Sequence, residues 1–112
     1  MSLLPNYERA IINSSKLRDY ILSPTHPIGR FKAKLFQKAG YAQDSWKTLE
    51  KDIRTQHLSK NVEEAGPSSF GQKYKITAPL KGPNSVTIVV TSVWIVLNAE
   101  DVPRLVTLIP GG

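Results

Sequence analysis

The stretch Val86-Thr87-Ile88-Val89-Val90-Thr91-Ser92-Val93-Trp94-Ile95-Val96-Leu97 decides the fold of this chain. It is almost continuously apolar and rich in β-branched residues, a composition that favours a strand in the interior of a sheet. Turn-forming residues precede it at 81–85 and follow it at 98–101. The stretch therefore predicts a central strand that short turns join to its neighbours.

The segments on both sides of this run extend the sheet. Residues 70–80 alternate with a period of two, the pattern of a half-buried strand, and Lys73 and Lys75 make one of its faces basic. Residues 104–109 read as a last strand, and residues 61–66 as a weaker first strand before a turn at 67–69. Two consecutive hairpins predict an antiparallel meander of about four strands. The inward positions of the second strand are Phe70, Gln72, Tyr74, Ile76, Ala78 and Leu80.

Before residue 60 the apolar spacing changes to the 3.6-residue period of helices. We expect a short helix between Ser14 and Pro24, a second helix over 27–39, and a third that begins at an Asp44 N-cap. The predicted buried stripe of the second helix is Ile28, Phe31, Leu35, Phe36 and Ala39, and its exposed cations are Arg30, Lys34 and Lys38. Helices followed by strands predict an α+β fold with the helices on one face of the sheet.

Length and composition limit the classes of protein. The 112 residues suit a single domain, with a helical part at 1–60 and a sheet part at 61–110. The formal net charge of +6 favours a polyanionic partner. The chain has no cysteine, no long apolar run and no leader-like N-terminus, so we expect a cytoplasmic protein that does not enter a membrane. Motifs for metals or nucleotide cofactors are absent too, so we expect neither.

One loop and helix start concentrates the groups that carry chemistry. His26, Arg30 and Lys32 lie within seven residues that end a proline-rich loop and open the second helix. A helix N-terminus attracts anions, and these side chains would add to that attraction. Lys32 falls inside the predicted apolar stripe, so its ammonium must reach solvent, find a partner or line a cleft. The alternative is a stiff connector before a basic, solvated helix face.

Four blocks of the chain resemble a bacterial family of domains of unknown function. The first runs from Lys16 to Ala33 and contains Ser23-Pro24-x-His26-Pro27-x-Gly29-Arg30-x-Lys32-Ala33. The others are Phe70-Gly71-Gln72-Lys73-Tyr74, then Gly82-Pro83 with Ser92-x-Trp94-Ile95-Val96, and Glu100-Asp101-Val102-Pro103-Arg104-Leu105-Val106-Thr107. The layout is similar to that of the barnase–EndoU–colicin–RelE group of ribonucleases and toxins. The resemblance implies a toxin-like module with an antitoxin-like partner.

Carried over to this chain, the resemblance implies a site made of His26, Arg30, Lys32 and Arg104. The hypothesis is metal-independent cleavage of RNA, in which His26 transfers a proton and the three cations stabilise charge on the phosphate. Phe31 stands where the family often has a histidine, so this chain lacks that second candidate for proton transfer. The predicted RNA-binding residues are Lys34, Lys73, Lys75 and Tyr74, although Tyr74 also shares the phase of the buried positions.

The same residues allow a non-catalytic interpretation. His26 and Arg30 would then hold the loop, and Arg30 or Arg104 would pair with Asp101 or Asp19. The chain as a whole would be an interaction domain that docks a small acidic protein. The remaining histidine, His57, falls at the end of the third helix, where it is either a half-buried helix-end residue or part of a site.

Overall fold

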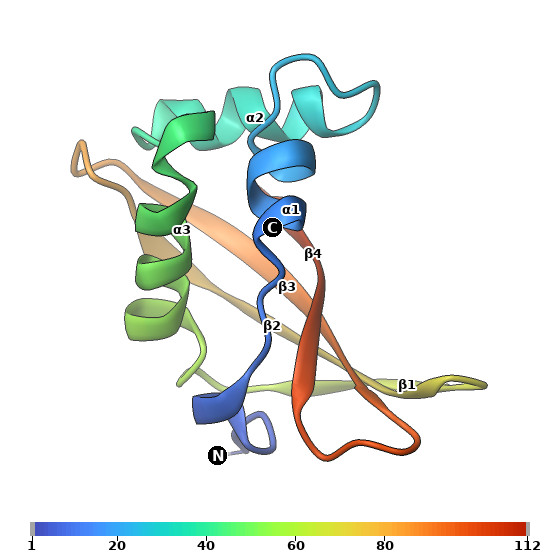
Figure 1. Cartoon of the computed structure of the whole chain (residues 1–112). Helices are drawn as coiled ribbons and strands as arrows, with labels where there is room; N and C mark the ends of the chain where they lie inside the picture. The colour runs from blue at the N-terminus through green and yellow to red at the C-terminus, as the bar shows by residue number, and fades with distance from the viewer. Residues whose placement is uncertain (1, 112) are drawn as a thin grey trace.

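The computed structural model describes residues 2–111, which form helical segments followed by a four-stranded sheet (Figure 1). The α+β fold, with the helices N-terminal and the strands C-terminal, is confirmed. The helical segments are η1 (Tyr7–Arg9), α1 (Ser14–Lys16) continued by the π-helical η2 (Leu17–Ile21), α2 (Gly29–Lys38), η3 (Gln43–Ser45), and α3 (Trp46–Asp52) continued by the π-helical η4 (Ile53–His57). The strands are β1 (Glu63–Ser68), β2 (Gly71–Lys81), β3 (Thr87–Leu97) and β4 (Pro103–Pro110).

The sheet is an antiparallel meander in the order β1-β2-β3-β4, as the hairpin pattern predicts. The predicted bounds of the first strand were wrong, because β1 continues through Pro67 and Ser68, where a turn was expected. Pro67 is tolerated there because β1 is an edge strand, so one side of its backbone has no ladder partner to lose. Beside the opposite edge, the chain at Ile11 forms a parallel bridge to Arg104.

The helices cover one face of the sheet and leave the other face open. Val90, Ser92 and Trp94 of β3 are buried under the helices, whereas Val89 on the opposite face keeps 44% of its surface exposed. The strand lies inside the sheet, as its composition predicts, but only one of its faces is covered. Its register with β2 pairs Thr77 with Thr91 on the open face, where their hydroxyls lie 2.8 Å apart.

The predicted buried stripe of α2 was largely wrong. Phe36 and Ala39 are buried, but Ile28, Phe31 and Leu35 are 61%, 58% and 38% exposed. The helix instead turns its small residues inward, because it packs closely against the backbone of η2. A Cβ atom on Gly29 would lie 1.7 Å from the Tyr20 carbonyl oxygen, so only glycine permits this approach. The rest of the buried face is Ala33, Phe36 and Ala39.

The third helical unit follows its apolar spacing more closely. Leu49 and Ile53 are buried and Trp46 is half-buried against the same core. The predicted cap was wrong: Asp44 lies inside η3, and the hydroxyl of Ser45 accepts the backbone N–H of Ala42 at 2.7 Å.

Candidate functional site

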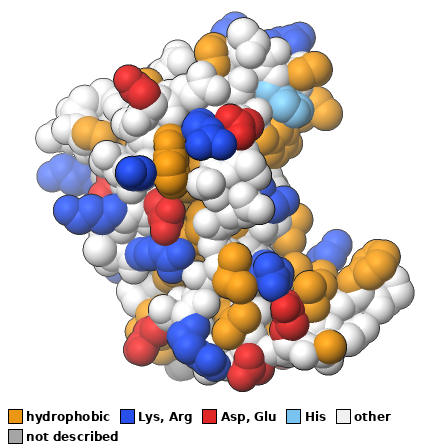
Figure 2. Space-filling view, viewed as in Figure 1, with side chains coloured by type: hydrophobic (Ala, Val, Ile, Leu, Met, Phe, Trp, Pro, Cys, Tyr) orange, Lys and Arg blue, Asp and Glu red, His pale blue; other side chains and the backbone are white. Residues whose placement is uncertain are grey.

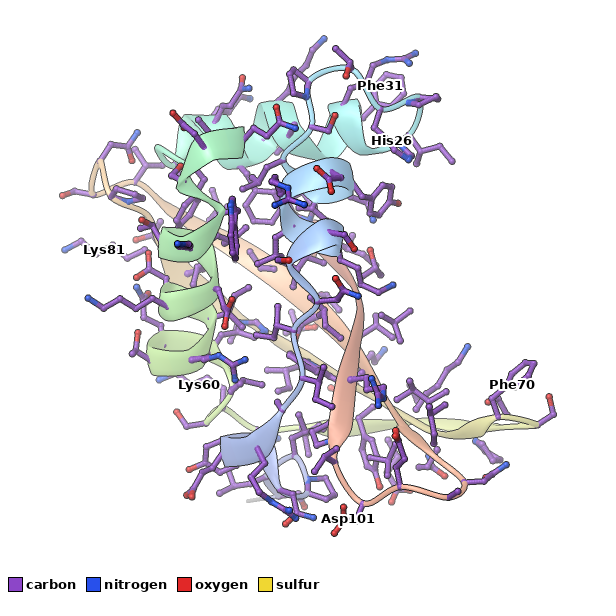
Figure 3. The ribbon with its side chains drawn as sticks, viewed as in Figure 1. His26, Phe31, Lys60, Phe70, Lys81 and Asp101 are labelled. Atoms are coloured by element: carbon purple, nitrogen blue, oxygen red, sulfur yellow. The ribbon has the colours of Figure 1, made fainter. Side chains whose placement is uncertain are left out.

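The surface is hollowed between the end of the molecule that carries α2 and the β1–β2 hairpin (Figure 2). His26 lies at the rim formed by the loop before α2, and Phe70 lies at the far tip of the hairpin (Figure 3). The motif block that contains His26 and the block that contains Phe70 therefore lie on opposite sides of the hollow. The ligands that the hollow can bind depend on the side chains that α2 and β4 contribute to it.

Lys32 joins α2 to the edge of the sheet. Its Nζ atom donates a hydrogen bond to Thr107 Oγ1 of β4 at 2.7 Å and lies 5.0 Å from the ring centre of Tyr20. The half-buried lysine thus finds a partner, one of the three outcomes expected for a cation on the buried side of a helix. An ammonium has three N–H donors, so two remain after the bond to Thr107.

A second lysine reaches the same strand. Lys16 Nζ donates to the carbonyl oxygen of Val106 at 3.1 Å, next to the residue that Lys32 contacts. Two ammonium groups therefore lie along one edge of β4. Sequence reasoning missed Lys16, Tyr20 and Thr107, although all three fall within the quoted motif blocks, because helical and strand periodicity do not show which side chains meet across elements.

His26 caps the helix that follows it. Its Nδ1 atom accepts the backbone N–H groups of Ile28 at 3.1 Å and Gly29 at 3.0 Å, and its ring packs edge-on against Tyr20 at 4.7 Å. The expected anion attraction by free N–H groups is therefore missing here, because His26 already satisfies two of them. Because Nδ1 accepts, the neutral ring carries its proton on Nε2. In this arrangement His26 is a hydrogen-bond donor rather than a base.

Arg30 and Phe31 form a stacked pair on the exposed side of α2. The guanidinium carbon of Arg30 lies 4.6 Å from the ring centre of Phe31. No carboxylate pairs with Arg30 among residues 2–111. Its charge is therefore available at the surface, whereas Lys32, two positions along the same helix, points to the other side, toward β4.

Arg104 is engaged elsewhere. It binds both carboxylate oxygens of Glu100 at 2.7 Å, and these hydrogen bonds hold the pKa of Glu100 below its usual range. It lines a shallow pocket of about 210 Å³ with Ile11 and Lys16, and stands three residues before Thr107, roughly 10 Å along the strand. No contact links it to His26, Arg30 or Lys32.

The alternative ion pairs suggested by the sequence were wrong. Asp101 pairs with Arg9 at 3.3 Å, and Asp19 pairs with its neighbour Arg18 at 2.9 Å. Neither carboxylate pairs with Arg30 or Arg104.

The predicted binding residues lie on different surfaces. Lys73 and Lys75 are on the open face of the sheet, and Lys75 forms an ion pair with Glu63 at 3.6 Å. Tyr74 lies on the opposite face and packs against the core. Lys34 is exposed on α2, away from the side that buries Ala33. Of these four predicted residues, Lys73 is therefore the one that places an ammonium without a carboxylate partner, within residues 2–111, on the open face of the sheet.

His57 belongs to the core. It is 1% exposed, and its Nε2 atom lies 2.7 Å from Ser92 Oγ, which also accepts the indole N–H of Trp94 at 2.7 Å. Burial lowers the pKa of His57 to about 4, with the backbone of Ile76 opposing part of that shift. Its Nδ1 atom has no hydrogen-bond partner of good geometry in the described chain. This location, with the imidazole bonded to a buried serine, makes His57 structural.

The comparison with family models matches residues 3–112 to a domain of unknown function, DUF6883. The chain belongs to this family. Comparisons with curated proteins and with solved structures found no match. Membership of DUF6883 agrees with the expected uncharacterised family, while the likeness to ribonuclease folds stays a prediction.

Within residues 2–111, no helix is long and apolar enough to cross a membrane, and no three His, Asp or Glu side chains gather as metal ligands.

Proposed function

We propose that this domain binds RNA in the hollow between α2 and the β1–β2 hairpin, with a phosphate held at the Lys32 end. The observation that carries the proposal is the bond between Lys32 and Thr107, because it brings the first and last motif blocks together. Lys32 keeps two donors, Arg30 has no carboxylate partner in the part of the chain that the structure describes, and His26 presents an Nε2–H. Cations and neutral donors of this kind contact phosphate oxygens.

The distribution of ion pairs supports a polyanionic ligand. Four of the five arginines are paired with carboxylates, but of the ten lysines only Lys75 is, within the described chain. Within the described chain, Lys16 and Lys32, which reach the same edge of β4, therefore carry charges that no carboxylate neutralises, and Lys73 carries another on the open face of the sheet. Binding of this type releases counterions, so affinity falls as the salt concentration rises.

The proposed reaction is metal-independent cleavage of the bound RNA. The 2′-hydroxyl attacks the adjacent phosphorus and gives its proton to water, the bond between phosphorus and the 5′-oxygen breaks, the 5′-oxygen takes up a proton from water, and a cyclic phosphate remains. The contribution that the geometry supports best is electrostatic: Lys32 would stabilise charge on the phosphate oxygens, and Arg30, on the exposed side of α2, would contact a neighbouring phosphate. His26 would donate a hydrogen bond from Nε2 to the same group. For His26 to take up a proton on Nδ1, it would have to release the N–H groups of Ile28 and Gly29.

A matched pair of variants tests the binding site. Fluorescence anisotropy with a labelled single-stranded RNA measures the affinity of wild type, Lys32→Met and Lys34→Met across a range of salt concentrations. Both substitutions remove one positive charge from α2, but only Lys32 contacts Thr107. We expect Lys32→Met to weaken binding by about tenfold, the loss of one charge-assisted contact, and Lys34→Met to change it less. Equal effects, or no RNA binding by wild type, would contradict the site.

Cleavage is tested separately, with the same RNA incubated with the protein in chelator. Wild type should generate cyclic-phosphate or 3′-phosphate ends, and Lys32→Met should generate far fewer. Binding without cleavage would contradict the proposed ribonuclease activity and would identify the chain as an RNA-binding domain without that activity.

A second candidate function is docking of a small acidic protein on the open face of the sheet. The observation in its favour is that Val89 and Ile109 on this face are 44% and 42% exposed, and that Lys73 lies further along the same face. An apolar centre with a charged rim is typical of protein interfaces. Val89→Asp should abolish such docking, because it removes an apolar contact and repels an acidic partner, and it should leave RNA binding at Lys32 intact.

A further inference from the structure

Phe70 is the most exposed large apolar side chain in the described part of the structure, at 72%. The strand pattern placed it among the inward positions, which was wrong, because the chain turns at Ser69 and Phe70 before β2 begins. In Figure 3 the residue lies at the outer end of the β1–β2 hairpin, on the arm that bounds the hollow opposite His26. Because folding removes so little of this ring from water, its burial contributes little to the stability of the fold.

The backbone beneath this ring is firmly held. The N–H of Phe70 donates to Ser68 Oγ at 3.2 Å, and its carbonyl accepts the backbone N–H of Asn98 at 3.0 Å. The Asn98 side chain also donates to the carbonyl of Ser69 at 2.9 Å. Hydrogen bonds to the β3–β4 turn therefore fix the hairpin tip. An exposed aromatic ring on a fixed backbone loses little conformational entropy when it binds.

The cation nearest to the ring in sequence is Lys73. It follows three residues later on the open face and has no carboxylate partner within the described chain, whereas Lys32 and Lys16 contact β4, at the opposite edge of the sheet from β1. An aromatic ring beside a positively charged groove is the arrangement that binds single-stranded nucleic acids, because the ring stacks on a base while the cations follow the phosphates. Paired bases in a duplex offer no such free face.

We propose that Phe70 stacks on an unpaired base and thereby selects single-stranded over double-stranded RNA. This inference rests on the proposed function and adds the class of RNA. It assigns Phe70 to specificity, at the opposite arm of the hollow from the phosphate contacts of Lys32.

The experiment measures the affinity of wild type, Phe70→Leu and Phe70→Tyr for a single-stranded oligoribonucleotide and for the duplex that it forms with its complement. Leucine keeps an apolar side chain at the tip without a ring, and tyrosine keeps the ring. We expect Phe70→Leu to weaken single-strand binding about 5- to 100-fold, the range for loss of one stacked base, while Phe70→Tyr stays within about threefold of wild type. Duplex binding should be weaker and unchanged by either substitution.

Three outcomes decide between the explanations. Single-strand affinity that is indifferent to Phe70→Leu overturns the stacking inference and leaves the RNA-binding proposal standing. Equal affinity of wild type for single strand and duplex overturns the selectivity. Failure of wild type to bind either RNA refutes the proposed function itself. Because Phe70 is outside the core, Trp94 fluorescence should confirm that all three proteins are folded in the same way.

Discussion

Lys32 and Thr107 are 75 residues apart in sequence, and their side chains meet at 2.7 Å. This hydrogen bond fixes the ammonium of α2 against the edge of β4. It connects the helical and sheet parts of the chain at the end of the hollow where we place the phosphate. Its removal should therefore affect both ligand binding and, to a smaller extent, stability.

Thr107→Val should remove the acceptor and keep the shape of the side chain. We expect a loss of about 1 kcal/mol in the free energy of unfolding and a weaker affinity for RNA, because the freed lysine must be ordered again on binding. Thr107→Ser should restore both quantities. Urea unfolding and RNA anisotropy measure the two effects, and a valine variant with wild-type RNA affinity would show that the bond does not orient Lys32.

His26→Asn distinguishes two roles of His26: capping of α2 through Nδ1, and the proposed contact of the imidazole Nε2–H with phosphate. Asparagine accepts N–H groups two and three residues ahead, so this variant should unfold within about 0.5 kcal/mol of wild type, whereas His26→Ala should lose about 1 kcal/mol. If the Nε2–H contacts the phosphate, both variants should bind RNA more weakly. If His26 is only a cap, His26→Asn should bind and cleave RNA as well as wild type.

His57 should make stability depend on pH. Its pKa in the folded protein, about 4, lies below the value of about 6.5 expected when it is unfolded, so the unfolded state takes up a proton first as the pH falls. The contribution of neutral His57 to the free energy of unfolding is fully present above pH 6.5. It is lost progressively as the pH drops toward 4, and the total loss is on the order of 3 kcal/mol.

Urea unfolding followed by tryptophan fluorescence at pH 7.5, 6 and 5 measures this effect, since the indole N–H of Trp94 shares Ser92 with His57. His57→Gln should be less stable than wild type at pH 7.5 but lose less stability between pH 7.5 and pH 5. An identical pH profile for the variant would assign the pH dependence to other groups.

Gly29→Ala should destabilise the fold severely. The added methyl group would lie 1.7 Å from the Tyr20 carbonyl oxygen, a backbone atom that cannot move without shifting η2. We expect a loss of at least about 2 kcal/mol, with α2 displaced from η2. Gln37→Ala, at an exposed position of the same helix, should leave the thermal midpoint nearly unchanged. Wild-type stability of Gly29→Ala would show that α2 and η2 are further apart.

Much of the candidate site was visible in the sequence as residues but not as contacts. His26, Arg30 and Lys32 lie close together because they share one loop and helix start. Arg104 belongs to a motif of the same family, yet its charge is paired with Glu100, a local partner four residues earlier. Thr107 belongs to the last motif but had no assigned role in the sequence analysis. The role of a strand hydroxyl depends on its hydrogen-bond partner, and the sequence does not show that this partner is Lys32.

By itself, the sequence determined the order of the elements and the antiparallel sheet, because periods of 3.6 and of two residues and turn-forming residues are local properties of the chain. Only the tertiary structure decided which sides of these elements are covered. Gly29 lets α2 approach the backbone at Tyr20, and that close packing exposes Ile28 and Phe31. The tertiary structure also decided that Lys32 contacts Thr107, because these residues belong to segments that are distant in sequence and come together only when the chain folds.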